Sequence, residues 1–355
     1  MTGVLTRGQL VVLALAAASS AGAGLLTGYG APAVLTFAVA AVALATLAAT
    51  VGEATDQLSA YMGPAATGIL QSAIGNLPEL FVCIFALRAG LVAVVQASLI
   101  GSILANALLV LGLAFVVGNV RGGRMRFESR TSRMIAVLLL LAVSAMILPT
   151  LAAQLHLPAG SHEPALAVIC ALVLLAVFAT SVRAMLGEGE RVLPEAAHAA
   201  ASGWPLGLAI GVLVVTGIGA AFVSEWFVAA LEPAIEALGI SQAFAGLVIV
   251  AIAGNAVENV VGIQLAAQGK ADYAVSVILN SALQIAVALV PILILVSFFV
   301  GGAPVTLALP PVLAIAVALT AILVTVITVD GEADEVEGAA LIGLYVLIAA
   351  VFWWG

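Results

Sequence analysis

Apolar residues fill this chain in long stretches that only a few polar positions interrupt. Most of these stretches are long enough for a helix of about 20 residues to cross the hydrocarbon core of a bilayer. Hydropathy predicts eleven of them, at residues 10–28, 33–60, 65–88, 91–117, 132–152, 164–186, 205–230, 243–267, 272–299, 304–328 and 339–354. The pattern therefore predicts an all-α polytopic membrane protein with about eleven transmembrane helices. A secretory signal at residues 9–26 is the alternative for the first stretch.

The composition supports a membrane protein and excludes several other classes. Of 355 residues, 64% are hydrophobic and 8% are charged, whereas globular chains carry about 25% charged residues. No stretch interleaves basic and aromatic residues, so nucleic acid is not an expected partner. Cys83 and Cys170 lie in apolar stretches and suggest neither a disulfide framework nor a metal site. No cofactor is expected.

The positions of Lys and Arg predict the orientation in the membrane. With the N-terminus inside, nine of these ten residues face the inner side and only Arg88 faces the outer side, as the positive-inside rule requires. The C-terminus is then outside, after Trp353 and Trp354. We expect an integral protein of a bacterial cytoplasmic membrane, with the lipid bilayer as a partner. The sequence leaves the oligomeric state open, a homo-oligomer being one option.

One polar phrase occurs twice. Gly75-Asn76-Leu77-Pro78-Glu79 recurs as Gly254-Asn255-Ala256-Val257-Glu258, at an offset of 179 residues. Without the first helix, the remaining ten divide into two sets of five, with the phrase in the second helix of each. Because five is odd, the halves enter the membrane from opposite sides, which predicts an inverted repeat with a site at the midplane. The predicted parts are an N-terminal helix (1–30), a first repeat (31–186), a cytoplasmic linker (187–203) and a second repeat (204–355).

The repeated phrase carries the chemistry of an oxygen-donor cation site. Asn76 and Glu79 are three residues apart and share one helix face, as do Asn255 and Glu258. A charged carboxylate at the bilayer centre costs about 2.5–3.5 kcal/mol on insertion scales, and two glutamates that share one divalent cation would offset much of it. Amide and carboxylate oxygens suit Ca²⁺, which takes 6–8 of them. A kinked helix whose glutamate bonds to a neighbour is the alternative.

Helix breaks at Gly75, Pro78 and Gly254 would supply further ligands. Pro78 has no N–H to donate to the carbonyl of Ile74, and glycine permits local unwinding. Carbonyl groups exposed at such breaks bind cations in discontinuous membrane helices.

The next helix of each half carries a second polar phrase. The phrases are Gly101–Asn106 and Asn280–Gln284, and Ser102 and Ser281 again differ by 179 residues. We expect Ser102, Ser281 and Gln284 to be ligands. For Asn106, a ligand and an interhelical hydrogen bond are equally good interpretations.

One further glutamate lies in the helix before each repeated phrase. Glu53 and Glu225 are candidates for proton coupling or gating, and anchoring a helix end is the alternative. A carboxylate in an apolar environment holds its proton more tightly than in water, and a second carboxylate nearby strengthens this. Such a pair would bind protons when empty and release them when a divalent cation arrives.

These residues resemble those of the calcium/proton exchanger family, the cation exchangers of the calcium/cation antiporter superfamily. The resemblance covers nearly the whole chain. It rests on Gly75–Leu80 with Ala86–Gly90, on Gly254–Glu258 through Lys270, on Asn280–Ala286 and on the tail from Asp330 to Tyr345.

The resemblance implies a non-enzymatic antiporter that exports cytosolic Ca²⁺ in exchange for protons, by alternating access. It implies that Glu79 and Glu258 bind the metal, that the polar residues around them complete the shell, and that Glu53 acts on protons or gating. Asn259 departs from the family, in which His is expected after the second glutamate. The linker also holds few acidic residues, which disfavours regulatory Ca²⁺ binding there.

Three alternatives remain at this point. A sodium/calcium exchanger shares the repeat plan, although its signature carries Thr-Ser where this chain has Asn76 and Asn255. Manganese or another divalent cation is also compatible with oxygen ligands. An intramembrane enzyme is disfavoured, because the chain has no His-Glu-x-x-His and its three histidines fall near predicted loops.

Overall fold

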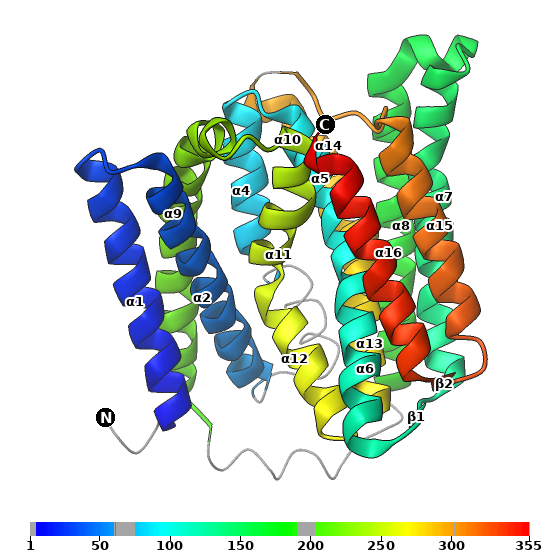
Figure 1. Ribbon diagram of the computed structural model, residues 1–355, viewed down its shortest axis with the longest axis horizontal. Helices are drawn as coiled ribbons and strands as arrows, with labels where there is room; N and C mark the ends of the chain where they lie inside the picture. The colour runs from blue at the N-terminus through cyan, green and yellow to red at the C-terminus, as the bar shows by residue number, and fades with distance from the viewer. Residues whose placement is uncertain (1–4, 60, 62–74, 190–202, 302, 355) are drawn as a thin grey trace. The chain divides into compact units, whose positions relative to one another are not determined.

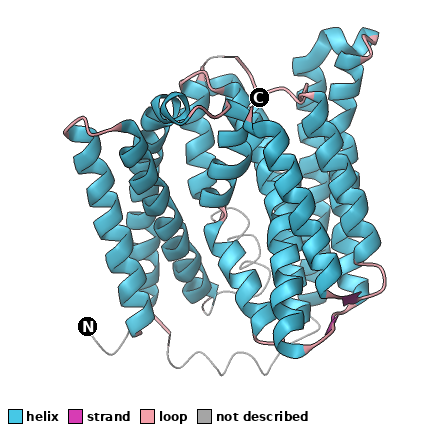
Figure 2. Cartoon of the chain, in the orientation of Figure 1, coloured by secondary structure: helices cyan, strands magenta, loops and turns pink. Residues whose placement is uncertain are grey.

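The computed structural model describes residues 5–59, 61, 75–189, 203–301 and 303–354. Almost all of these residues form helices, joined by short loops (Figures 1 and 2). The chain packs into two compact units, and each unit combines separate stretches of sequence. Unit 1 comprises Met1–Phe85 and Ala176–Gly239, and unit 2 comprises Ala86–Leu175 and Ile240–Gly355.

Unit 1 is built around the packing of α2 on α9 and on α1. A capping box between Thr6 and Gln9 begins α1, and the rings of Phe37 and Phe227 stack between α2 and α9 at a centroid distance of 4.7 Å. Its helices are α1 (Arg7–Gly28), α2 (Ala33–Ser59), most of α4 (Leu77–Arg88), the end of α8 (Glu163–Gly189) and α9 (Leu206–Leu238).

The helix α9 is longer than the stretch 205–230 that hydropathy predicts. It continues through Pro233 to Leu238 and ends at Gly239, which adopts a left-handed conformation with φ 64°. Hydropathy ends the stretch early because Glu232 and Glu236 lower the local average without breaking the helix.

Unit 2 contains most of the buried core, with α5 buried at nearly every position after Val94. Three of its helical segments are π-helices, labelled η1, η4 and η5, and π-helical segments are often found at functional sites. Its elements are α5 (Val92–Leu104), η1 (Ala105–Val110), α6 (Leu111–Gly122), β1 (Met125–Arg126), α7 (Ser129–Gln154), the 3₁₀ helix η2 (Pro158–His162), the start of α8, α10 (Gln242–Phe244), η4 (Ala245–Val250), α11 (Ala251–Gly254), α12 (Ala256–Ala267), α13 (Ala271–Gln284), η5 (Ile285–Leu289), α14 (Val290–Val300), α15 (Pro311–Ile327), β2 (Glu332–Ala333) and α16 (Glu335–Trp353).

Glycines allow two pairs of helices in unit 2 to touch at the backbone. A Cβ atom at Gly101 of α5 would overlap the carbonyl oxygen of Leu247 in η4. Between α6 and α16, a Cβ at Gly112 would lie 2.6 Å from the carbonyl oxygen of Gly338, and one at Gly338 would lie 2.7 Å from that of Gly112. Small residues at helix contacts are the usual way in which membrane helices approach closely.

The sequence offset of 179 residues also relates the bounds of helices. Both ends of α4 and α12 differ by 179, as do the starts of α5 and α13 and the ends of α2 and α9. The π-helices η1 and η5 correspond to within one residue. Within unit 2, α5 and α13 run in opposite directions (Figure 1).

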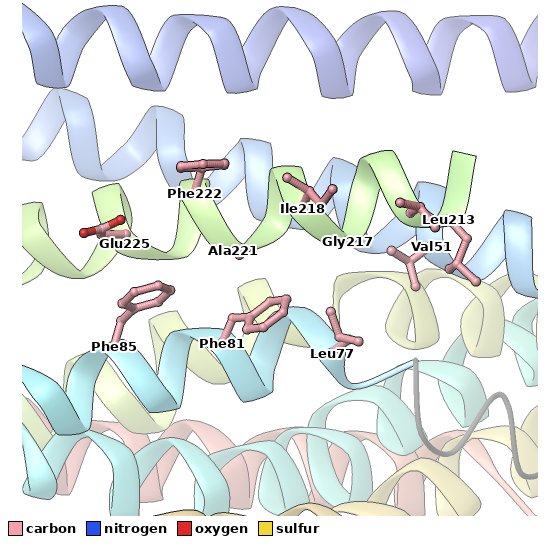
Figure 3. A pocket seen from close by; sticks show the side chains of 11 residues that line it. Val51, Leu77, Phe81, Phe85, Leu213, Gly217, Ile218, Ala221, Phe222 and Glu225 are labelled. Carbon is pink, nitrogen blue, oxygen red and sulfur yellow. The ribbon is translucent and has the colours of Figure 1, made fainter. Parts of the chain in front are cut away.

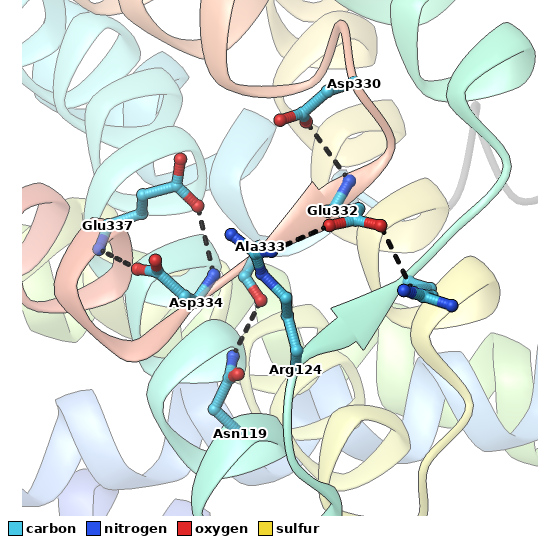
Figure 4. A network of polar contacts seen from close by, with 8 residues as sticks. Asn119, Arg124, Asp330, Glu332, Ala333, Asp334 and Glu337 are labelled. Atoms are coloured by element: carbon cyan, nitrogen blue, oxygen red, sulfur yellow. Dashed lines mark hydrogen bonds and ion pairs between the residues drawn. The ribbon is translucent and has the colours of Figure 1, made fainter.

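A two-stranded antiparallel sheet joins two loops of unit 2 that we predict to face the inner side (Figure 4). Arg124 and Arg126 form ion pairs with Glu332 at 3.1 and 3.2 Å. The amide of Asn119 donates to the carbonyl oxygen of Ala333 at 3.0 Å. Both loops therefore lie on the same side of unit 2, as the predicted orientation requires.

By length and composition, eight helices among the described residues could cross a membrane, and a bent pair would make nine. The apolar helix α15 is shorter than the predicted stretch 304–328, because Pro310 and Pro311 allow the helix to begin only there. The preceding extended segment bonds instead to Thr150, whose hydroxyl donates to the carbonyl of Leu307. The count of eleven stays a prediction, since residues 62–74 of the third predicted helix lie outside the described residues.

Candidate functional site

Both copies of the repeated phrase lie where a helix begins. In unit 2, α11 ends at Gly254 and α12 begins after Asn255, with a bend of 64° between the two helical segments. In unit 1, α4 begins at Leu77, so Pro78 occupies the first turn, where its missing N–H removes no helical bond. Ile74, whose carbonyl we expect to be free, lies outside the described residues.

The glutamate of each copy occupies the first turn of its helix. Glu79 is in the first turn of α4 and is 1% exposed, and Glu258 is in the first turn of α12. The unpaired N–H groups and the dipole at the start of a helix favour negative charge there. The local backbone therefore stabilises each carboxylate, which the sequence pattern alone did not indicate.

In unit 2, Asn255 is fully buried and held by its amide nitrogen. Its Nδ2 donates to the hydroxyl of Ser102 and to the carbonyl of Ala251, both at 2.9 Å. The backbone carbonyl of Ala251 can only accept a hydrogen bond. The reverse orientation of the Asn255 amide would therefore place its Oδ1 against that carbonyl oxygen, with no donor between them. The Oδ1 atom of Asn255 has no hydrogen-bond partner among the described residues, so it is available as a ligand.

Other buried oxygens on the neighbouring helices are arranged in the same way. Asn106 in η1 donates from Nδ2 to the carbonyl of Ser102 at 3.0 Å, and its Oδ1 has no partner in the described part of the chain. The hydroxyl of Ser281 is also buried without one, on α13, which packs against both η1 and α12. Gln284 is partly buried and ends α13 just before η5.

Carboxylates alone do not account for a cation site here. Among the described residues, no group of three or more His, Cys, Asp or Glu side chains is placed to hold a metal ion. A site around Glu258 would therefore take amide and hydroxyl oxygens as well, which are ligands that Ca²⁺ accepts.

Sequence reasoning missed two polar atoms of unit 2. The Oδ1 of Asn259 and the hydroxyl of Ser98 are both buried without a partner in the described residues. Each lies four residues from a candidate ligand, Asn259 after Asn255 and Ser98 before Ser102, and therefore on the same helix face. That spacing was the available signal, but neither residue is part of the 179-residue repeat.

In unit 1, Asn76 is buried. Its backbone carbonyl accepts a hydrogen bond from the backbone N–H of Leu80 at 2.9 Å, which closes the first turn of α4. Glu79 follows on the same turn, whereas Glu258 belongs to unit 2. The 179-residue repeat relates the two glutamates.

Glu53 is bound by two glutamines of unit 1. Its Oε1 accepts from Nε2 of Gln9 at 2.6 Å and from Nε2 of Gln57 at 3.0 Å. Gln57 in turn accepts the N–H of the buried Trp204 at 3.0 Å. Glu53 thus connects α1 and α2 with the residues that lead into α9.

Glu225 lies in different surroundings. It is exposed on α9, and no hydrogen bond or ion pair joins it to another described residue. It lines one end of an apolar pocket of about 520 Å³ between α9 and α4 (Figure 3).

Comparisons with known proteins agree on one family. The model of the family described as sodium/calcium exchanger protein matches residues 32–187 and 208–354. A Ca²⁺/H⁺ antiporter of Synechocystis sp. is 34% identical over 337 residues, which cover 89% of this chain and 90% of the relative. The Ca²⁺/H⁺ antiporter ChaA of Bacillus subtilis is 34% identical over 326 residues, which cover 90% and 92%.

Solved structures show the same fold. Native YfkE matches with a TM-score of 0.82 at 30% identity, over 96% of this chain and 99% of that one. The H⁺/Ca²⁺ exchanger CAX matches with a TM-score of 0.75 over 98% and 92%, and at 15% identity this likeness concerns the fold alone.

Proposed function

Because the chain belongs to the sodium/calcium exchanger family, and within it to the calcium/proton exchangers, we propose that it exchanges Ca²⁺ for protons across a membrane. It exports cytosolic Ca²⁺ by secondary active transport, driven by protons that move inward. The curated relatives named as Ca²⁺/H⁺ antiporters support this, since they are about one third identical to nearly the whole chain.

The orientation of Asn255 is the observation that carries the proposal. Both N–H groups of its amide are used by Ser102 and Ala251, and its buried Oδ1 is left without a partner among the described residues. An unpaired buried oxygen costs about 1–3 kcal/mol, and a bound cation removes this cost. The same holds for the unpaired oxygens of Asn106 and Ser281.

The complete site takes one glutamate from each half. We assign Glu79 and Glu258 as the charged ligands, and Asn76, Asn255, Ser102, Ser281, Gln284 and Asn106 as their polar surround. The matching bounds of α4 and α12 and the opposite directions of α5 and α13 support two inverted halves. Such a repeat places the shared site at the midplane and allows access to alternate between the two sides.

Proton coupling follows if the same carboxylate oxygens bind either protons or Ca²⁺. Protons leave the two glutamates when the cation arrives and return when it departs. Glu53 and Glu225 have gating roles in this scheme. The bonds of Glu53 to Gln9 and Gln57 support a gate, because they tie together α1 and α2 near the start of α9.

Uptake of ⁴⁵Ca²⁺ into inside-out vesicles with an acidic interior tests the proposal. We expect wild type and the control Glu163→Gln, at the start of α8, to accumulate Ca²⁺ only while the pH gradient lasts. Glu79→Gln and Glu258→Gln should reduce uptake to background, because each leaves the divalent cation with one carboxylate.

Two other results would change the assignment. Uptake driven by a sodium gradient instead would make the protein a sodium/calcium exchanger, and uptake of manganese without calcium would change the cargo. Full activity in both glutamine variants would contradict the assigned ligands.

A further inference from the structure

The pocket in unit 1 is a slot between two helix faces (Figure 3). On α9 its lining residues recur every three or four positions from Leu213 to Glu225, and on α4 they recur every four from Leu77 to Phe85. Residues at these spacings share one face of a helix, so the slot runs along both helices, with Val51 of α2 at one end. Its volume of about 520 Å³ lies within the range of about 300–1,000 Å³ that is typical of small-molecule sites.

The slot is charged at one end only. Glu225 and Phe85 lie at one end in Figure 3, and Val51 and Leu77 lie at the other. Every lining residue except Glu225 is apolar. Glu225 has no ion pair or hydrogen bond to another described residue, so a carboxylate in a membrane helix is left without a partner, which marks it as a candidate functional residue.

The depth of Glu225 suits a head group. It lies nineteen residues after Leu206, the first residue of α9, which is about 29 Å at 1.5 Å per residue. The hydrocarbon core of a bilayer is about 30 Å thick. A helix that enters at one membrane surface therefore brings Glu225 close to the other surface, with the apolar end of the slot deeper in the membrane.

We propose that this pocket binds an amphiphilic ammonium compound, with its cationic head at Glu225 and its apolar tail along Phe81 toward Leu77. The ammonium group supplies the charge that Glu225 lacks. The rings of Phe85 and Phe222 lie near Glu225 in Figure 3 and offer cation–π contacts to an ammonium group. A neutral chain would leave the carboxylate uncompensated, and an anionic head would be repelled by it.

A ligand in this pocket would also affect exchange. Its tail would contact Leu77, the first residue of α4, two positions before Glu79. By filling the space between α4 and α9 it would hold the helix that carries Glu79 and slow transport. This consequence rests on the proposed function, whereas the binding itself does not.

Binding of radiolabelled dodecyltrimethylammonium to the protein in phosphatidylcholine nanodiscs tests the proposal without Ca²⁺ or a gradient. We expect saturable binding of one molecule per chain above the partition into empty nanodiscs. Glu225→Gln should weaken it at least tenfold, while Glu225→Asp should retain most of it. Glu232→Gln is the matched control, since Glu232 is exposed on the same helix outside the pocket, and it should bind like wild type.

A second variant tests the shape of the slot with the charge intact. A Cβ at Gly217 would have only Leu77 within 4 Å, at 4.0 Å, so Gly217→Phe places a ring in the slot without a backbone clash and should abolish binding. Binding that is not saturable, that dodecanol or dodecyl sulfate displaces equally well, or that persists unchanged in Glu225→Gln would overturn the proposal. Thermal unfolding of each variant, with wild-type midpoints expected, excludes loss of the fold as the cause.

Discussion

At the scale of single residues, the candidate site contains two asparagine side chains, Asn255 and Asn106. In each, Nδ2 donates hydrogen bonds, and Oδ1 has no partner among the described residues. Asn255 and Asn106 both direct Nδ2 to atoms of Ser102, so this serine orients two potential ligands. Its hydroxyl accepts from Asn255, and its carbonyl accepts from Asn106. In the proposed site, Ser102 would therefore act on the cation partly through the two residues that it positions. Its backbone carbonyl would still hold Asn106 after the side chain is changed.

Ser102→Ala should weaken Ca²⁺ binding about fivefold and leave the fold intact. The variant removes one of the two bonds that orient Asn255, and a neutral hydrogen bond contributes about 1 kcal/mol net, which corresponds to about fivefold in affinity. Equilibrium binding of ⁴⁵Ca²⁺ to the purified protein measures this. The double variant Ser102→Ala, Asn255→Ala should bind no more weakly than Asn255→Ala alone, because the two residues act together.

Ser98→Ala is the matched control, since Ser98 is a buried serine one turn earlier on α5 that has no bond to Asn255. The loss of Ca²⁺ affinity in Ser98→Ala should be smaller than that in Ser102→Ala, because Ser98 orients neither Asn255 nor Asn106. An equal loss in both serine variants would show that polarity along α5, rather than the bond to Asn255, determines affinity.

At the scale of elements, close helix contacts hold these residues in position. The backbones of α5 and η4 touch at Gly101 and Gly246, and a Cβ at either glycine would overlap a backbone atom of the other segment. Gly101 directly precedes Ser102, and η4 leads through α11 to Asn255. The distance between these helices therefore determines whether the bond between Ser102 and Asn255 can form.

Gly101→Ala should lower both the stability and the Ca²⁺ affinity of the protein. A methyl group without space forces the helices apart, and overpacking of this kind costs about 1–3 kcal/mol. Thermal unfolding in detergent and ⁴⁵Ca²⁺ binding measure the two effects.

For comparison, Gly211→Ala in α9 adds a methyl group where nothing lies within 4 Å. It should be neutral or stabilising by up to about 1 kcal/mol, since alanine favours a helix more than glycine does. A wild-type unfolding midpoint for Gly101→Ala would show that α5 and η4 can separate at no cost.

At the scale of the whole molecule, the pairing of two loops in unit 2 is compatible with the orientation that the charge distribution predicts. Around β1 and β2, Arg124 and Arg126 form ion pairs with Glu332, and Asp334 and Glu337 form the capping box of α16 (Figure 4). The positive-inside rule predicts that both loops face the inner side. The pairing makes it impossible for one loop to face inward and the other outward.

Cysteine labelling tests this orientation. In a background with Cys83→Ala and Cys170→Ala, both of which replace buried thiols, a membrane-impermeant maleimide should react with Ser161→Cys in intact cells. It should react with Gly122→Cys only after the membrane is permeabilised, because Gly122 belongs to the predicted inner loop. Reversed labelling would invert the predicted orientation, and labelling of both positions in intact cells would contradict the topology.

The class of the protein and the 179-residue offset between its two polar phrases can be read from the sequence alone, which also names Glu79 and Glu258 as candidate ligands. Hydropathy follows from composition along the chain, and the offset between Asn76–Glu79 and Asn255–Glu258 follows from spacing. Neither property depends on contacts between distant residues. The same local information limited the helix bounds, since α9 continues past its hydropathy minimum and α15 begins late at a proline pair.

Which polar atoms have hydrogen-bond partners depends on contacts between segments that are distant in the sequence. Ser102 and Asn255 are 153 residues apart and bond to each other, and Glu53 is bound by Gln9 of another helix. The residue 179 positions before Glu225 is not acidic, so the repeat does not single out this glutamate. In the structure, Glu225 lines an apolar slot and has no partner among the described residues. The role of a polar atom depends on the neighbours that other segments place around it. Only the packing of those segments provides these neighbours.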